Sequence, residues 1–305
     1  GVPEQTCVSA GYYTFDLAAP VPLAEGDDYY VKVRYRTPGW ATPLPAETLV
    51  EGYNDPVIEW GNCWTKMPDR QSWNTEDGYI DPCIYAYTTP NRVRTAVRVM
   101  LEGPYRSGGS MASELNALQV IPAVSPYADG RSAEAVPEGV TDWVYLELRH
   151  PDGVTAVGGR SFFLKNDGNV VETDGTTADL LIPGVLPGAY YIVVRHRNHG
   201  AVMSSLPSAL DPLTPACVDF TASSEACYGT GGQKLLENGV WGMWAGDGNE
   251  DGQITTADYS AWYNSARVGD LGYVSADFNL DSQVTTGDYS AWYNTARSGG
   301  ASQVP

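Results

Sequence analysis

The sequence predicts a mainly β chain in which two β-sandwich-like domains precede a small α-helical module that binds calcium. Three observations predict this class: short runs of alternating apolar and polar residues, turns rich in Gly and Pro between them, and an Asp- and Asn-rich segment that occurs twice. A chain of 305 residues is long enough for two or three domains, each with its own core.

The first domain is expected over residues 1–105. Tyr29 to Arg36 alternates with a period of two, as a half-buried strand does, and Ile84 to Thr88 and Arg92 to Leu101 repeat the pattern. Runs of this length separated by turns favour an antiparallel sandwich.

Part of this first domain resembles a known family. The motifs that carry the resemblance lie between Asp28 and Thr88: Tyr30-Val31-Lys32-Val33, Thr37-Pro38-Gly39, Leu44-Pro45-Ala46-Glu47, Gly52-Tyr53 and Cys83-Ile84-Tyr85-Ala86-Tyr87-Thr88. The stretch resembles the lectin-like β-sandwich attached to some secreted bacterial papain-family proteases. The resemblance implies a sandwich and an extracellular role, with no sugar specificity attached.

Residues 106–139 are rich in Gly, Ser, Ala and Pro and are predicted to form a linker or crossover, with a short helix near Ser113 to Leu118. A second small sandwich is expected over 140–205, and a connector over 206–240. The predicted strands of the second sandwich are Trp143 to Arg149, Ser161 to Leu164, Ala178 to Ile182 and Tyr190 to Arg195.

Five widely spaced cysteines, with no C-x-x-C pair, predict disulfides rather than a thiolate zinc site. Cys217 and Cys227 would close a short loop in the connector, where a covalent link stabilises most. Cys63 would pair with Cys83 or with Cys7, and the odd count leaves one thiol unpaired or bonded to another chain.

The module expected over 241–305 contains an internal repeat with an offset of 30 residues. Two twelve-residue loops, from Asp247 to Asp258 and from Asp277 to Asp288, offer oxygen at positions 1, 3, 5, 9 and 12, with a backbone carbonyl at position 7. Oxygen in this pattern is what a hard cation such as Ca²⁺ requires. The predicted ligands of two calcium sites are Asp247, Asn249, Asp251, Gln253, Thr255 and Asp258, and then Asp277, Asn279, Asp281, Gln283, Thr285 and Asp288.

The duplicated loops, with Asp at position 12 and one helix after each loop, resemble the dockerin module. Position 6 is Gly252 in loop one but Ser282 in loop two, where a sharp turn without Gly costs about 1 kcal/mol, so we expect the second site to be weaker. Without metal, the acidic loops should repel themselves open.

Each repeat carries aromatic residues at helical spacing, namely Tyr259, Trp262 and Tyr263, and again Tyr289, Trp292 and Tyr293. They form either the core between two helices or a partner surface, since dockerins bind cohesins through these helices. Both roles can hold, because two helices cannot hide six large aromatic side chains completely. Trp241 and Trp244 offer the module a seat on its own chain.

No catalytic constellation is predicted. Cys63-Trp64 is similar to the Cys-Trp pair of papain-like proteases, but its context is β-rich and Cys83 is available for a disulfide. His196 and His199 lie three apart, which on one strand places them on opposite faces, so satisfied histidines are favoured over metal ligands. We therefore expect the chain not to be an enzyme.

The 37 acidic residues against 18 basic ones give a formal net charge of −19, which disfavours nucleic acid as a partner. No apolar stretch is long enough to span a membrane. The first residues lack the pattern of a signal peptide, so we expect a processed form of an exported protein, extracellular or on a cell surface.

The sequence favours a non-catalytic structural or assembly protein, such as a self-associating fibre or matrix subunit stabilised by calcium, whose partners are copies of itself or a cohesin-like protein. Gly1 to Ala10, with an unpaired Cys7, could add to a neighbouring sheet. Two alternatives stay open: a carbohydrate-binding, lectin-like accessory protein that docks to a cohesin-type partner, and a fragment of a larger secreted hydrolase.

Overall fold

The computed structural model describes residues 91–305 continuously and, before them, only isolated residues and short strands. The chain divides into two compact units, Gly1–Thr89 and Pro90–Pro305. In the first unit, two antiparallel pairs are described: β1 (Ala46–Glu47) with β4 (Asp81–Pro82), and β2 (Trp64–Thr65) with β3 (Asn74–Thr75).

The strand expected from Tyr29 to Arg36 is not found at those of its residues that the structure describes. Tyr29 and residues 31–34 are described outside any strand. Val31 and Val33, the side chains that were to face a core, are 51% and 45% exposed, so the alternation there is not matched by burial. The expected strand from Ile84 to Thr88, and Cys7, Cys63 and Cys83, lie outside the described residues.

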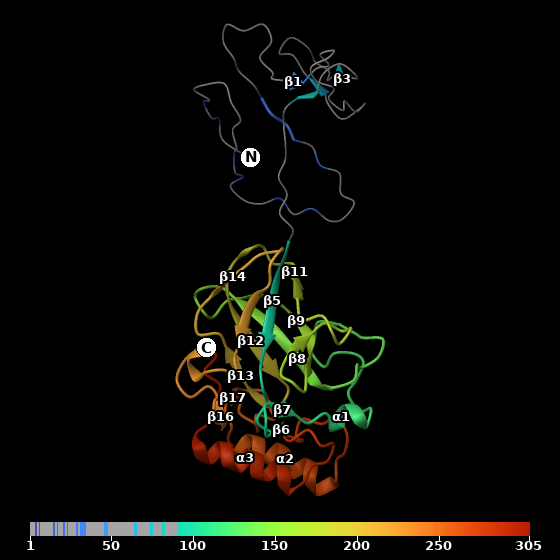
Figure 1. The fold of residues 1–305 in the computed structure, drawn as a ribbon, viewed down its shortest axis with the longest axis vertical. Helices are drawn as coiled ribbons and strands as arrows, with labels where there is room; N and C mark the ends of the chain where they lie inside the picture. Colours follow the sequence, from blue (N-terminus) through green and yellow to red (C-terminus); the bar gives the residue numbers. More distant parts are fainter. Residues whose placement is uncertain are drawn as a thin grey trace. The chain divides into compact units, whose positions relative to one another are not determined.

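The second unit is built on a sheet with strand order β10-β9-β8-β12-β13, in which β14 also pairs with β12 and neighbouring strands are antiparallel (Figure 1). Its strands are β8 (Val140–Arg149), β9 (Ala156–Lys165), β10 (Val170–Val171), β12 (Gly188–His196), β13 (His199–Met203) and β14 (Ser208–Leu210). Three of the predicted strands of the second sandwich are therefore confirmed within β8, β9 and β12.

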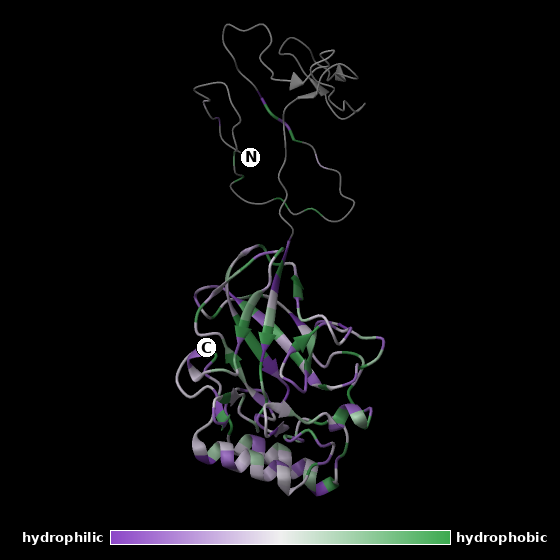
Figure 2. Cartoon of the chain, viewed as in Figure 1, coloured by the Kyte–Doolittle hydropathy of each residue, from purple (hydrophilic) through white to green (hydrophobic). Residues whose placement is uncertain are grey.

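A second, three-stranded sheet has the order β11-β5-β15 and covers one face of the first. It consists of β5 (Arg92–Arg98), β11 (Leu180–Pro183) and β15 (Ala216–Asp219), with β15 parallel to β5. Trp143, Phe162 and Phe220 are fully buried in the core that both sheets share. Figure 2 shows the apolar character of these strands. The mainly β class is confirmed.

The expected domain boundaries differ from the structure. β5 belongs to the second unit, because it pairs with β11 and β15 and so cannot close the first domain. Residues 106–139 are no free linker: Met111, Leu115 and Ile121 enter the core. They lie around β7 (Ser110–Met111), which pairs with β6 (Tyr105–Arg106), and α1 (Glu114–Ala117), close to the predicted short helix.

Residues 206–240 likewise supply β14, β15, the 3-10 helix η1 (Ser224–Ala226) and β16 (Lys234–Glu237), which pairs with β17 (Val240–Gly242). The predicted bridge between Cys217 and Cys227 is wrong, because both are free thiols. Cys217 is exposed on β15, where it pairs with Ala96 of β5. Cys227 is buried, and its backbone pairs with that of Ser204 in an isolated β-bridge. Strand pairing thus fixes this segment without a disulfide.

Two helices follow the sandwich, α2 (Thr256–Val268) and α3 (Thr286–Ser298), and lie side by side at one end of the unit (Figure 1). Each begins with a capping box of Thr and Asp and ends at a glycine in the left-handed conformation, Gly269 or Gly299. No helix among the described residues is long and apolar enough to cross a membrane.

Candidate metal centre

The two predicted calcium loops have the same backbone path. Positions 4 and 6 are left-handed in both, at Glu250 (φ 59°) and Gly252 (φ 82°) in loop one and at Leu280 (φ 60°) and Ser282 (φ 73°) in loop two. Position 7 of each loop forms an isolated antiparallel β-bridge with the third residue after the end of the other loop's helix, so that Gln253 pairs with Ala301 and Gln283 pairs with Leu271. The two copies of the 30-residue repeat, each a loop and its helix, are therefore related by an approximate two-fold axis.

Within each loop, position 1 is bonded to position 6. The carboxylate of Asp247 accepts the Gly252 N–H at 3.1 Å, and that of Asp277 accepts the Ser282 N–H at 2.8 Å. The carboxylates at position 12, Asp258 and Asp288, accept N–H groups from position 3 and position 9 of their own loops. These bonds wrap each loop around its own acidic side chains.

The remaining predicted ligands are engaged inside the loops as well. At positions 3 and 5, Asn249 donates to Asp251 at 2.8 Å and Asn279 donates to Asp281 at 2.9 Å. At position 9, the hydroxyls of Thr255 and Thr285 accept the N–H of Ala257 and Gly287 and so cap α2 and α3. Position 9 thus has a structural role in addition to the predicted ligand role.

Electrostatics in the loops favour a cation. Burial and then repulsion from Asp258 raise the pKa of Asp247 to about 7, and burial raises the pKa of Asp277 to about 7 as well. Asp247 also has a buried Oδ1 with no hydrogen-bond partner. An unpaired, buried carboxylate oxygen is costly, and a bound cation would satisfy it. The donor set, made of carboxylate, amide and backbone oxygens, fits Ca²⁺.

The carboxylates alone do not make a cluster. In the part of the chain that the structure describes, no group of three or more His, Cys, Asp or Glu side chains is placed to hold a metal ion. Only three predicted ligands of each loop are carboxylates, at positions 1, 5 and 12, and these carboxylates accept backbone or side-chain N–H groups of their own loop. A metal would therefore also need the amide, hydroxyl and carbonyl oxygens of the loop.

The aromatic residues of α2 and α3 divide between two roles. The indole of Trp262 donates to the Thr285 carbonyl at 2.9 Å, and that of Trp292 donates to the Thr255 carbonyl at 2.7 Å, so each tryptophan ties its helix to the other loop. Tyr259 and Tyr289 pack between the helices at 6.2 Å, in an edge-on arrangement. These four residues form the core of the module together with Ile254, Phe278 and Trp244. Trp244 is one of the two upstream tryptophans that were expected to pack against the module.

Tyr263 and Tyr293 are different. They remain 49% and 42% exposed, at equivalent places on the two helices. Each stacks on the tyrosine one turn earlier in its own helix, Tyr259 or Tyr289. Of the six aromatic residues, these two offer the most side-chain surface to a partner.

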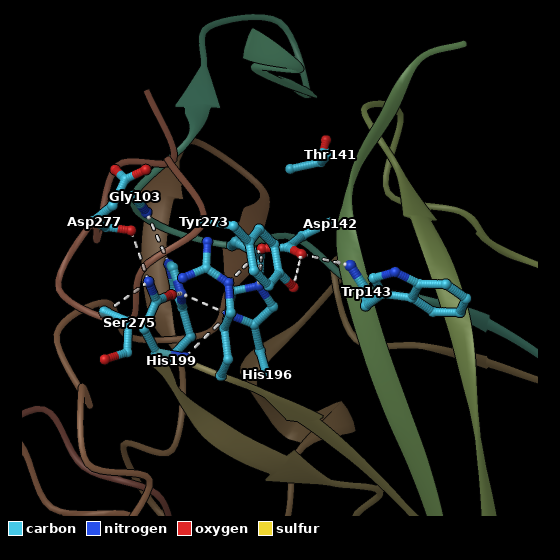
Figure 3. Close-up of polar contacts among 12 residues, drawn as sticks. Gly103, Thr141, Asp142, Trp143, His196, His199, Tyr273, Ser275 and Asp277 are labelled. Carbon is cyan, nitrogen blue, oxygen red and sulfur yellow. Dashed lines mark hydrogen bonds and ion pairs between the residues drawn. The ribbon is translucent and has the colours of Figure 1, made fainter. Parts of the chain in front are cut away.

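A buried polar network joins the module to the sandwich, at the turn between β12 and β13 (Figure 3). Burial alone would raise the pKa of Asp142, but Arg197 at 2.9 Å and His196 at 3.2 Å hold it well below its usual range. Tyr273, in the segment between the repeats, donates to the same carboxylate at 2.6 Å. Arg197 lies over the Tyr273 ring at 4.1 Å and donates to the Val274 carbonyl.

The expectation that His196 and His199 lie on opposite faces is wrong. They belong to two strands, β12 and β13, and the turn between them brings their Nδ1 atoms to 3.1 Å. Both are buried, and burial lowers both pKa values. Sequence reasoning missed this network because its partners are 54 to 131 residues apart; the run of polar residues at the end of an apolar strand was the available signal.

Comparison with protein families supports the lectin-like resemblance of the first domain. The family model of the lectin-like domain matches residues 2–88, which confirms the lectin-like resemblance and extends it toward the start of the chain. No curated protein matches the chain.

Two crystal structures of type II cohesin–X-dockerin complexes from Acetivibrio cellulolyticus, an N-terminal and a C-terminal interface mutant, are similar at 13% and 14% identity. The alignments cover 67% of this chain and 94% of those chains, with TM-scores of 0.31 and 0.30.

Proposed function

We propose that residues 246–305 bind two Ca²⁺ ions and that the chain is an extracellular, non-catalytic protein whose calcium module docks to a protein partner. The observation that carries the calcium sites is the repeated loop geometry, in which each position-1 carboxylate is buried and bonded to position 6 and Asp247 keeps an unpaired oxygen. Calcium would supply the positive charge that these loops lack.

The partner surface is proposed on the exposed side of α2 and α3. Tyr263 and Tyr293 occupy equivalent places there, whereas Trp262 and Trp292 are engaged with the loops. Aromatic side chains that are exposed in a repeated arrangement are typical of a protein interface. The dockerin resemblance makes a cohesin-type protein the proposed partner. Docking would attach the lectin-like domain to that partner, and glycans are the proposed ligands of the lectin-like domain.

Calorimetry of EDTA-treated chain titrated with Ca²⁺ tests the calcium sites. We expect two bound ions, with Asp247→Ala and Asp277→Ala each removing one of them and lowering the melting temperature of the module. Asp270→Ala, at an exposed acidic residue between the loops, is the matched control and should keep both sites. A stoichiometry of zero for the unchanged chain would contradict the proposal.

Self-association is the second candidate, and the same exposed pair of tyrosines favours it, because a second copy could cover them. The arm from Gly1 to Ala10, on which the strand-addition hypothesis depends, lies mostly outside the described residues. Sedimentation with millimolar Ca²⁺ separates the two candidates. A monomer at every concentration that is retained by an immobilised cohesin only when Tyr263 and Tyr293 are intact supports docking; assembly without a partner supports self-association.

A further inference from the structure

Asn198 lies outside both calcium loops yet contacts the first residue of each. It is fully buried in the turn between β12 and β13. Its backbone carbonyl accepts the N–H of Gly246 at 3.1 Å and that of Asp247, position 1 of loop one, at 3.2 Å. Its side-chain amide donates to the carbonyl of Asp277, position 1 of loop two, at 2.7 Å, and to that of Ser275 at 3.1 Å.

The amide of Asn198 is held in one orientation by a chain of hydrogen bonds. The Gly103 N–H donates to Nε2 of His199 at 3.2 Å, so that nitrogen is an acceptor and the proton of the neutral ring lies on Nδ1. Nδ1 of His199 can then donate to Oδ1 of Asn198 at 2.8 Å. Because Oδ1 is thereby occupied, the Nδ2 group faces the carbonyls of Asp277, in loop two, and of Ser275, just before it.

The main chain of Asn198 is fixed in a similar way. Its N–H points to Nδ1 of His196 at 3.4 Å, while Nε2 of that ring faces the Asp142 carboxylate at 3.2 Å. Asp142 is fully buried and also bonded to Arg197 and Tyr273. The turn is therefore anchored to the sandwich on one side and to the segment between the two repeats on the other (Figure 3).

We propose that Asn198 is a shared positioning residue that couples the two calcium sites, acting on loop one through its main chain and on loop two through its side chain. This inference rests on the proposed calcium binding. An ion that immobilises Asp247 or Asp277 also immobilises the hydrogen bond between that residue and Asn198. Because Asn198 is hydrogen-bonded to the other loop as well, that second hydrogen bond is then stabilised too. Partners that orient metal ligands from outside the coordination sphere are known to contribute to metal affinity.

The division between main chain and side chain gives the inference a site-resolved test. Asn198→Ala removes the amide but keeps the carbonyl, so it should weaken loop two and spare loop one. Calcium affinity is measured in two backgrounds: Asp247→Ala, which leaves loop two, and Asp277→Ala, which leaves loop one. We expect Asn198→Ala to lower the affinity of loop two by about 10- to 100-fold and that of loop one by about twofold or less. Asn264→Ala, at an exposed residue of α2, is the control and should change neither.

An equal loss in both backgrounds would mean that Asn198 only stabilises the fold, and no loss in either would mean that it positions nothing; each result overturns the inference. If the unchanged chain binds no Ca²⁺, the proposed function fails instead, which is a different outcome.

If Asn198→Ala does not fold, coupling between the loops can be measured in a chain that retains Asn198. In the Asp247→Ala chain, Ca²⁺ can load only loop two. Coupling then predicts slower hydrogen exchange at the backbone N–H of Gly246 and of residue 247, both bonded to the Asn198 carbonyl. Unchanged exchange at these two positions would show that the loops are independent.

Discussion

Loop one and loop two have the same length and the same ligand types but different surroundings. Loop one borders a cavity of about 280 Å³, whose lining includes Asp247, Asp251 and Gly252. In loop two, Asp277 and Phe278 are fully buried and Ser282 is only 8% exposed, with Gly103 and the Asn198 amide against the loop. A repeated sequence therefore does not give two equal sites, because the sandwich contacts the two copies differently.

This contrast changes the expectation that loop two is weaker. Ser282 does adopt the left-handed conformation, as position 6 requires, and carries the strain that the sequence predicted. The same loop, however, gains a side-chain hydrogen bond from Asn198 to Asp277, and Asn198 donates a second one to Ser275 just before the loop; each contributes about 1 kcal/mol. Contacts from the sandwich can thus offset the missing glycine.

The largest difference between the loops is expected from glycines in the sandwich. A Cβ at Gly103 would lie 1.7 Å from the Phe278 carbonyl oxygen of loop two, whereas the nearest atoms to one at Gly200 would be those of Ser302, Ile254 and Ala301, at 3.3 Å, 3.7 Å and 3.8 Å. Gly103→Ala should destabilise the unit by about 3 kcal/mol or more, because backbone must move, and Gly200→Ala by about 1 kcal/mol or less. Urea denaturation in EDTA measures both.

Equal losses for these two variants would mean that loop two is not seated more tightly than loop one. Gly184→Ala, where no atom lies within 4 Å of the added carbon, is a control for the effect of alanine at a glycine site; its positive φ alone should cost about 1 kcal/mol.

An intermediate effect is expected from pH, and it should be similar in both loops. The pKa values of Asp247 and Asp277 are both raised to about 7, so a proton competes with Ca²⁺ below that pH. Apparent affinity should fall as pH is lowered from 8 to 6.5, approaching about tenfold per pH unit at each site at the acidic end. Calorimetry in the single-site variants Asp247→Ala and Asp277→Ala measures each loop separately, and affinity that is constant over this window would contradict the prediction.

The metal-free chain should show the opposite sign. Its folded-state pKa values near 7 lie above the unfolded value of about 3.9, so the folded state binds more protons between these limits and gains stability as pH falls through 7. Below about pH 6.5, His196 and His199, whose pKa values are lowered, act in the other direction. Melting temperatures in EDTA between pH 8 and 6.5 isolate the carboxylates.

The sequence predicted what depends on local patterns and missed what depends on distant neighbours. Period-two runs located β8 and β12, and the repeat placed both loops and helices, because strand pleat and loop chemistry are set within a few residues. The predicted domain boundary was wrong at β5, because β5 pairs with β15, which lies more than one hundred residues away in the sequence. Asn198 could not be found either, since its role comes from a turn that meets both loops in space.

The smallest effect is expected from exchanging the residues at position 6. Ser282→Gly removes left-handed strain of about 1–2 kcal/mol at φ 73°, but glycine also gains freedom in the unfolded chain, which returns about 0.5–1 kcal/mol of this. We expect a net gain of about 0.5–1 kcal/mol in unfolding free energy, and a similar loss for Gly252→Ser at φ 82°, where Ser302 lies 3.3 Å from the added carbon. Urea denaturation of each variant in EDTA and in Ca²⁺ measures these changes. With both exchanges together, the missing glycine lies in loop one, which lacks the Asn198 amide, so loop one should become clearly the weaker site. If loop one is not the weaker site in that double variant, neither the residue at position 6 nor the Asn198 amide determines the difference between the loops.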